Sequence, residues 1–257
     1  MIVLKSPEEI ELMRTAGKVN LEIFEGLKQF IRPGTTTMDI DRYVEEAVKS
    51  HGMIASEKGY CGFPANVCTS VNEEVVHGIP SKDRVLNEGD IVSVDLVVEY
   101  EHYMADSCRT FGVGKISDEA QHLIDTAERS FFEGIRFAKE GCRLHDISHR
   151  IQEIVEGEGF GVIRDYTGHG IGSEMHEDPP IPNYGKAGKG PRLQKGMTLA
   201  IEPMIVQGSY ETETLLNNWT VVTEDGGWAA HYENTVLITE GEPEIFTYSG
   251  EAPVIQE

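Results

Sequence analysis

The chain repeats part of its own sequence at one fixed spacing, and this repeat restricts the folds open to it. Five residues recur 107 positions later: Gly34, Asp39, Ile40, Glu46 and Gly52 match Gly141, Asp146, Ile147, Glu153 and Gly159. A second block keeps the offset: Leu86, Gly89, Val94 and Asp95 match Leu193, Gly196, Ile201 and Glu202. Because this period is too long for a solenoid, we interpret it as a duplicated α+β half, with helices at about 38–51 and 145–158. Residues 1–257 would then form a single domain of two related halves, roughly 1–110 and 111–257.

Two acidic residues interrupt apolar runs near the middle of the chain. Asp95 lies in 91–98 and Asp106 in 103–113, and both runs have the pattern of buried strands. If a two-residue hairpin near 100–101 joins them, Asp95 lies directly opposite Asp106, with about 5 Å between the side chains. A divalent cation between the two carboxylates would remove their repulsion. The alternative is a pair of acids at exposed strand positions.

Two further acids repeat this pattern in the second half. Glu202 lies in the run 198–206 and Glu233 in 228–239, whose other residues suit interior strands. An acid in such a strand is costly unless it is paired or bound to a metal ion.

A histidine between glycines completes the set. His169 lies in Tyr-Thr-Gly-His-Gly-Ile-Gly, where small neighbours allow close approach to the imidazole. Alone, it would be a turn residue more often than a ligand. The five residues together indicate a carboxylate-bridged two-metal hydrolase: Asp95, Asp106, His169, Glu202 and Glu233.

Motifs along nearly the whole chain resemble those of the type I methionine aminopeptidases. They are Gly-Phe-Pro (62–64), Val-Cys-Thr-Ser-Val-Asn-Glu-Glu-Val-Val-His-Gly-Ile-Pro (67–80), Gly-Asp-Ile-Val-Ser-Val-Asp (89–95), Ala-Asp-Ser (105–107), Gly-His-Gly-Ile-Gly (168–172), His-Glu-Asp-Pro (176–179), Ile-Glu-Pro-Met (201–204) and Tyr-Glu-Asn-Thr (232–235). The resemblance implies the α+β pita-bread fold, in which two pseudo-symmetric halves share a central antiparallel sheet with helices outside. The chain would thus be one catalytic domain.

The resemblance also implies a role for each candidate ligand. Asp95, Asp106 and Glu233 would hold one metal ion, while Asp106, His169, Glu202 and Glu233 would hold the other. Glu202 would also act as general base and proton shuttle. The two ions would activate the water that hydrolyses the peptide bond.

Two more histidines match family residues that contact the substrate and stabilise the developing charge, His77 and His176. By the same resemblance, the methionine pocket would be lined by Tyr60, Cys61, Cys68, Met175 and Trp219. Ordinary core packing is the alternative role for each of these five. The implied reaction releases the initiator methionine from nascent proteins and peptides, with a preference for a small second residue.

The sequence departs from the family pattern at four positions that are not ligands: Cys61, Thr167, His231 and Asn234. These departures affect the contacts of the pocket and the groups that orient Glu233. They leave open which metal the site prefers, and the ligand types suit Co²⁺, Mn²⁺, Fe²⁺ or Zn²⁺.

The composition indicates a cytoplasmic enzyme. No signal peptide or membrane anchor is recognisable, and four cysteines without a C-x-x-C pair predict free thiols. A net charge of −22 argues against direct binding of nucleic acid. The resemblance implies a monomer that meets ribosomes transiently, through its nascent-chain substrate.

Two other functions remain open from the sequence. One is a related pita-bread peptidase that cleaves X-Pro bonds, although such enzymes usually carry an extra N-terminal domain. The other is a metal-free binding protein on the same scaffold. Loss of a ligand would mark that second group, and here all five are present.

Overall fold

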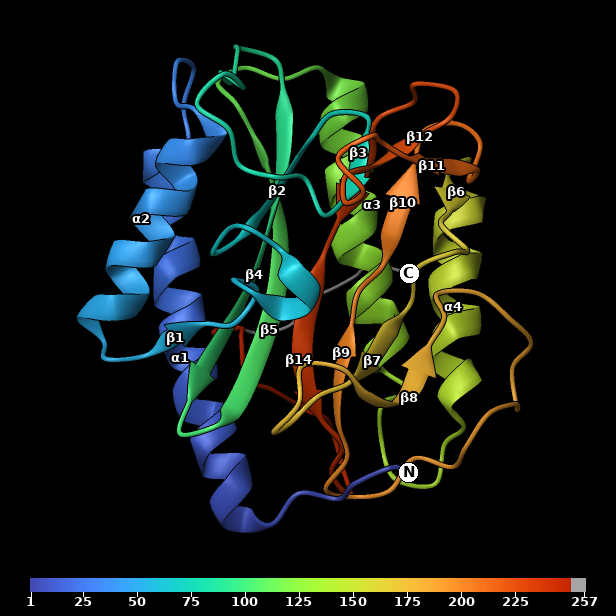
Figure 1. The fold of residues 1–257 in the computed structure, drawn as a ribbon. Coiled ribbons are helices and arrows are strands. Elements are labelled where there is room, and N and C mark those ends of the chain that lie inside the picture. The colour runs from blue at the N-terminus through green and yellow to red at the C-terminus, as the bar shows by residue number, and fades with distance from the viewer. Residues whose placement is uncertain (251–257) are drawn as a thin grey trace.

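The structure is a computed structural model that describes residues 1–250 (Figure 1). Its four α-helices are α1 (Pro7–Phe30), α2 (Thr37–Ser50), α3 (Asp118–Ile135) and α4 (Leu144–Gly157). The strands are β1 (Ile54–Ala55), β2 (Cys68–Val71), β3 (Glu74–Val76), β4 (Ile91–Tyr100), β5 (Tyr103–Gly112), β6 (Gly161–Val162), β7 (Gly168–Gly170), β8 (Glu177–Ile181), β9 (Thr198–Ile201), β10 (Met204–Val206), β11 (Thr212–Thr214), β12 (Val221–Thr223), β13 (Ala229–His231), β14 (Glu233–Leu237) and β15 (Glu244–Ile245). A short 3₁₀ turn, η1, covers Tyr60–Gly62.

One large antiparallel sheet organises the molecule. Its main path runs β1-β4-β5-β14-β9-β7-β8, while β2 pairs with β4 and β15 with β14. The helices lie behind this sheet in two pairs, with α1 and α2 beside β4 and β5, and α3 and α4 on the other side (Figure 1). Each pair closes its own apolar core against the strands in front of it.

Local sequence signals explain where the helices begin. Ser6 accepts a hydrogen bond from the backbone of Glu9, whose carboxylate accepts one from the Ser6 backbone in return. Thr36 and Asp39 form the same reciprocal arrangement at the start of α2. Such capping boxes satisfy amide donors that the first turn of a helix leaves free.

The two helices predicted from the repeat are confirmed to within one residue, as α2 and α4. Backbone contacts around them also recur at the sequence offset. Gly34 donates to Leu86 O at 2.8 Å, and Gly141 donates to Leu193 O at 3.0 Å. The bridge of Thr36 with Val85 has its counterpart in that of Arg143 with Arg192.

The β4–β5 hairpin differs from the predicted register. Its reversal lies at Glu101 and His102, which both have positive φ, so Asp95 pairs with Cys108 and Asp106 pairs with Val97. The prediction that Asp95 and Asp106 lie directly opposite each other is therefore wrong by two positions. A shift of two residues keeps every side chain on its original face, so the apolar pattern cannot reveal it. Both acids still point to the same side of the sheet.

Candidate metal centre and substrate cavity

The five candidate ligands come from five neighbouring strands of the large sheet. Asp95 lies on β4, Asp106 on β5, Glu233 at the start of β14, Glu202 directly after β9, and His169 on β7. The strands follow one another in the order β4-β5-β14-β9-β7. Residues spread over more than half of the chain are thereby brought to one place.

Buried polar contacts hold the two aspartates from behind. Asn20 of α1 donates to Leu96 O at 2.7 Å and to Ala105 O at 3.2 Å, which are the backbone groups next to Asp95 and Asp106. The Asp106 backbone also exchanges two hydrogen bonds with the hydroxyl of Thr235 on β14. These contacts fix both acids to α1 and β14, and they could not be predicted because the partners are distant along the chain.

The two glutamates lie where long apolar runs break into separate strands. Glu202 lies between β9 and β10, and Glu233 begins β14 after β13 has ended at His231. In each run the first and second parts pair in different sheets. Arg109 stabilises the break between β13 and β14. Its guanidinium lies 4.3 Å over the Tyr232 ring and donates a hydrogen bond to the Glu233 carbonyl. Each glutamate therefore occupies a bend in its run.

Close packing of three strands explains the glycines around His169. A Cβ on Gly168 would lie 2.4 Å from Ala200 O on β9, and one on Gly170 would lie 2.2 Å from Asp178 O on β8. The strand that carries His169 can therefore fit between its neighbours only with glycine on both sides.

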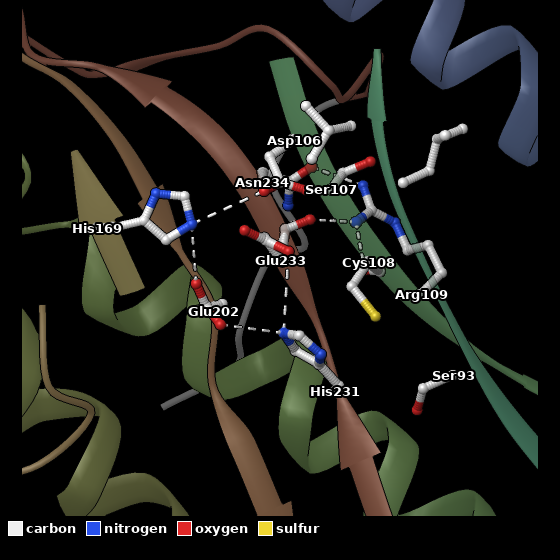
Figure 2. A network of polar contacts seen from close by, with 12 residues as sticks. Ser93, Asp106, Ser107, Cys108, Arg109, His169, Glu202, His231, Glu233 and Asn234 are labelled. Atoms are coloured by element: carbon white, nitrogen blue, oxygen red, sulfur yellow. Dashed lines mark hydrogen bonds and ion pairs between the residues drawn. The ribbon is translucent and has the colours of Figure 1, made fainter. Parts of the chain in front are cut away.

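Distances place the ligand-type atoms within reach of one another (Figure 2). His169 Nε2 lies 3.7 Å from Asp106 Oδ2 and 3.5 Å from Glu202 Oε1. One ligand atom from each of Asp106, His169 and Glu233 lies within 4.8 Å of the others, and all three residues are buried. His169 Nδ1 lies 2.9 Å from Gly170 O, and since a carbonyl only accepts, the proton is on Nδ1 and Nε2 keeps its lone pair.

The charge of this cluster indicates a divalent cation. Burial raises the pKa of Asp95 to about 6. Burial in the first place, and neighbouring carboxylates in the second, hold the pKa values of Asp106, Glu202 and Glu233 well above their usual range. Asp95 Oδ1, Asp106 Oδ1 and Glu233 Oε1 are buried without a hydrogen-bond partner. Within residues 1–250, the only basic side chains at ion-pair distance from this cluster are histidines. Cations supply the compensation that such a site needs.

His231, named from the sequence as a departure among the groups that orient Glu233, is a further functional candidate at this cluster. Its Nε2 lies 3.8 Å from both Glu202 Oε2 and Glu233 Oε2 and has no hydrogen-bond partner (Figure 2). Burial lowers its pKa to about 3, so the ring is neutral at pH 7.

His176 and His77 line the same space. The His176 ring lies 4.2 Å from that of His169, and its Nδ1 lies 2.7 Å from the Tyr60 hydroxyl. His77 packs edge-on to Tyr166 and Trp219 at 5.7 and 6.2 Å. Burial lowers the pKa of His77 to about 4, so this ring is also neutral at pH 7.

A cavity of about 250 Å³ opens beside the acidic cluster. It is lined by all five candidate ligands, by both histidines and by the five expected pocket residues, Tyr60, Cys61, Cys68, Met175 and Trp219. Other lining residues were not predicted from the sequence, among them Glu57, Phe63, Val97, Tyr166 and Met204. Aromatic and sulfur-containing side chains thus line the cavity together with the ligand-type residues.

The remaining sequence expectations concern thiols and membranes. All four cysteines are free, as predicted. In the part of the chain that the structure describes, no helix is both long enough and apolar enough to cross a membrane.

Comparisons with known proteins agree with this geometry. A family model described as metallopeptidase family M24 matches residues 11–240. The methionine aminopeptidase of Clostridium acetobutylicum is 57% identical over 96% of this chain and 99% of its own length. The crystal structure of methionine aminopeptidase from Thermotoga maritima has a TM-score of 0.95 at 46% identity, covering 97% of this chain and 100% of that chain.

A likeness of fold extends to a proline-specific enzyme. The prolidase from Pyrococcus furiosus gives a TM-score of 0.78 at 24% identity and covers 97% of this chain but 66% of that one. Together with the Thermotoga structure it confirms the predicted pita-bread fold. The chain therefore belongs to metallopeptidase family M24 and, within that family, to the methionine aminopeptidases.

Proposed function

We propose that this protein is a two-metal methionine aminopeptidase that releases the initiator methionine from nascent proteins and peptides, favouring a small second residue. One observation carries the proposal: five neighbouring strands bring five ligand-type side chains to the end of one cavity. Family membership makes the enzyme a metal-dependent hydrolase, and peptides with N-terminal methionine are its substrates.

In this proposal, Asp95, Asp106 and Glu233 hold one ion, and Asp106, His169, Glu202 and Glu233 hold the other. The unpartnered buried oxygens of Asp95, Asp106 and Glu233 support this assignment, as does the free Nε2 of His169. Oxygen donors with one imidazole suit Co²⁺, Mn²⁺, Fe²⁺ or Zn²⁺.

Glu202 is the residue best placed to move protons. When bound, a pair of divalent ions lowers the pKa of water and polarises a carbonyl oxygen. Glu202 would accept a proton from the attacking water and return it to the leaving amine. His231 packs beside this carboxylate, with its Nε2 3.8 Å from Glu202 Oε2.

The two histidines stabilise the scissile carbonyl. When the Tyr60 hydroxyl donates to Nδ1 of His176, the proton of this imidazole lies on Nε2, which is then free to donate into the cavity. His77 is neutral and lies between Tyr166 and Trp219, so it donates through one N–H group. Donors placed where negative charge develops accelerate acyl transfer.

The aromatic and sulfur-containing residues that line the cavity receive the methionine side chain. Tyr60, Cys61, Cys68, Met175 and Trp219 supply apolar and polarisable surface, which suits an unbranched thioether. Phe63 supports Trp219 at a ring separation of 5.1 Å. We also propose a cytoplasmic monomer that meets ribosomes only transiently, because its net charge of −22 opposes lasting contact with RNA.

The test is release of the N-terminal residue from Met-Ala-Ser and from a matched X-Pro peptide. Chelated enzyme is titrated with Mn²⁺, Fe²⁺, Co²⁺ or Zn²⁺ in parallel. We expect metal-dependent cleavage of Met-Ala-Ser alone. Cleavage of the X-Pro peptide alone would assign the chain to the proline-specific relatives, and no cleavage with any metal would favour a binding role.

A further inference from the structure

A buried ion pair joins the segment before α1 to the loop that carries His176. Residues 1–6 lead from α1 toward β8 (Figure 1). There Lys5 Nζ lies 2.6 Å from Glu177 Oε2, and the two side chains are 2% and 10% exposed. The backbone of the segment is held as well, because Lys5 N donates to Gly196 O at 2.8 Å. The proposed reaction uses neither of these charged residues.

Close packing fixes the ion pair against the backbone between β7 and β8. A Cβ on Gly172 would lie 2.1 Å from Lys5 Cε and 2.5 Å from Glu177 Oε1. Only glycine therefore leaves room for the pair at this point. Gly172 is itself tied to β5, since its carbonyl accepts a hydrogen bond from Met104 N at 2.9 Å.

The Glu177 carboxylate contacts both the segment and the loop. Its Oε2 accepts a hydrogen bond from Lys5, while its Oε1 accepts one from the Glu174 backbone at 3.5 Å. The Glu174 carbonyl in turn accepts from Gly172 N at 3.2 Å. One carboxylate thus links residues 1–6 to the β7–β8 loop, residues 171–176.

The β7–β8 loop ends in two residues that line the cavity, Met175 and His176. His176 directly precedes Glu177, and its ring lies 4.2 Å from that of His169. Any displacement of Glu177 would therefore move His176 relative to the scissile carbonyl.

Stability alone does not account for an ion pair that is this deeply buried. Removing two charges from water costs about as much free energy as their attraction returns, and apolar residues of similar volume often replace such pairs without loss. The place of this pair, next to a histidine of the cavity, points to orientation instead.

We propose that Lys5 is a positioning residue, which through Glu177 holds the β7–β8 loop so that His176 is aimed at the scissile carbonyl. This inference rests on the proposed function, since it assumes that His176 donates to that carbonyl. Positioning matters because a donor lowers the barrier only when it lies where negative charge develops.

The experiment is a double-mutant cycle between Lys5 and His176. It measures kcat, KM and bound metal for Mn²⁺-loaded enzyme with Met-Ala-Ser. Lys5→Met removes the charge and keeps a side chain of similar length. Lys5→Met/Glu177→Gln leaves no unpaired buried carboxylate and keeps an acceptor for the loop amide. Lys49→Met is the matched control, because Lys49 pairs with Glu45 at 2.9 Å on the exposed surface of α2.

We expect Lys5→Met to lower kcat about 10-fold at unchanged KM, less than the about 10²-fold loss expected when a donor is removed outright. Lys5→Met/Glu177→Gln should melt closer to wild type yet keep the low kcat. In a His176→Ala background neither change should lower kcat further, because the loop no longer carries the donor. Lys49→Met should behave as wild type, and metal content should be equal throughout.

Four results would overturn the inference. They are a wild-type kcat in the Lys5 variants, an equal loss of kcat with and without His176, a loss that follows bound metal, and a loss that Glu177→Gln reverses together with Tm. If Lys5→Met alone does not fold, Lys5→Met/Glu177→Gln decides the matter. Failure of the proposed function would differ from all four, since wild type would then not cleave Met-Ala-Ser.

Discussion

At the scale of single residues, one hydrogen bond to a histidine ring decides which of its nitrogens carries the proton. The Gly170 carbonyl fixes the proton of His169 on Nδ1, so the opposite nitrogen faces the acids as a lone pair. The Tyr60 hydroxyl can do the reverse for His176, which then keeps its proton toward the cavity. Neighbouring imidazoles thus acquire different roles, one as ligand and one as donor.

The first prediction concerns Glu202, to which we assign both metal binding and proton transfer. Glu202→Ala should abolish turnover of Met-Ala-Ser, and Glu202→Gln should reduce kcat by about 10²–10⁴-fold, the contribution of general acid–base catalysis. Steady-state kinetics with measured metal content tests this. Full activity in Glu202→Ala would exclude the two-metal assignment, while Glu211→Ala, on the exposed surface, serves as the control.

The second prediction separates substrate contact from metal binding. His77→Ala should lower kcat about 10²-fold, because one donor to the developing oxyanion is lost. Bound metal should remain at the wild-type level, since His77 is not one of the proposed ligands. Elemental analysis beside the kinetics measures both. His122→Ala on α3 is the control, and metal loss in His77→Ala would contradict a role in substrate contact alone.

At the scale of elements, the alternation of apolar and polar residues predicts which side chains share a face of a strand. It does not predict the register between neighbouring strands. The runs around Asp95 and Asp106 were predicted as strands, and both acids share a face, yet the register is two positions from the prediction. The reversal uses Glu101 and His102 at positive φ without an Asn-Gly or Asp-Gly signal, so nothing local marked the turn. A shift of two residues leaves every side chain on the same face, so the apolar periodicity cannot detect it.

Contacts between distant elements were equally hidden from the sequence. Glu57 reaches the site through a hydrogen bond from the Val97 backbone on β4, and no spacing rule connects the two residues. The five ligand candidates could be found because acids in apolar strands are unusual. A buried acid in an irregular segment, such as Glu57, lacks that contrast.

The third prediction tests the packing of β7. Gly170→Ala should cost about 1–3 kcal/mol of unfolding free energy, because the added methyl meets the Asp178 carbonyl and something must shift. Gly157→Ala near the end of α4 is the matched control. It meets nothing within 4 Å, so it should be neutral or gain up to about 1 kcal/mol. Urea unfolding measures both, and equal stability of the two variants would argue against the close approach.

At the scale of the whole molecule, the division into halves of roughly 1–110 and 111–257 stays a prediction. The recurring hydrogen bonds of Gly34 and Gly141 support it, because they join equivalent backbone groups 107 residues apart. Under this interpretation, β4 and the end of β9 are repeat mates that flank β5 and β14 in the sheet. Duplication then explains why acids from both halves meet at one site.

The last prediction links the stability of the whole molecule to pH through this acidic site. Folding raises the pKa of Asp95 to about 6 and raises those of Asp106, Glu202 and Glu233 well above their usual range, while unfolded carboxyl groups titrate near 4. The metal-free folded state therefore binds more protons than the unfolded state, so this contribution to stability is complete below about pH 4 and is lost as pH rises through the folded pKa values.

Chelated enzyme should melt at a lower temperature at pH 8 than at pH 5.5, whereas added Mn²⁺ should raise Tm more at pH 8, since metal and protons compete for the same oxygens. Calorimetry with and without chelator checks this, with Asp95→Asn expected to show a smaller dependence on pH. A Tm of the chelated wild type that rises steadily from pH 5.5 to 8 would mean that these carboxylates do not form a buried cluster without compensating charge.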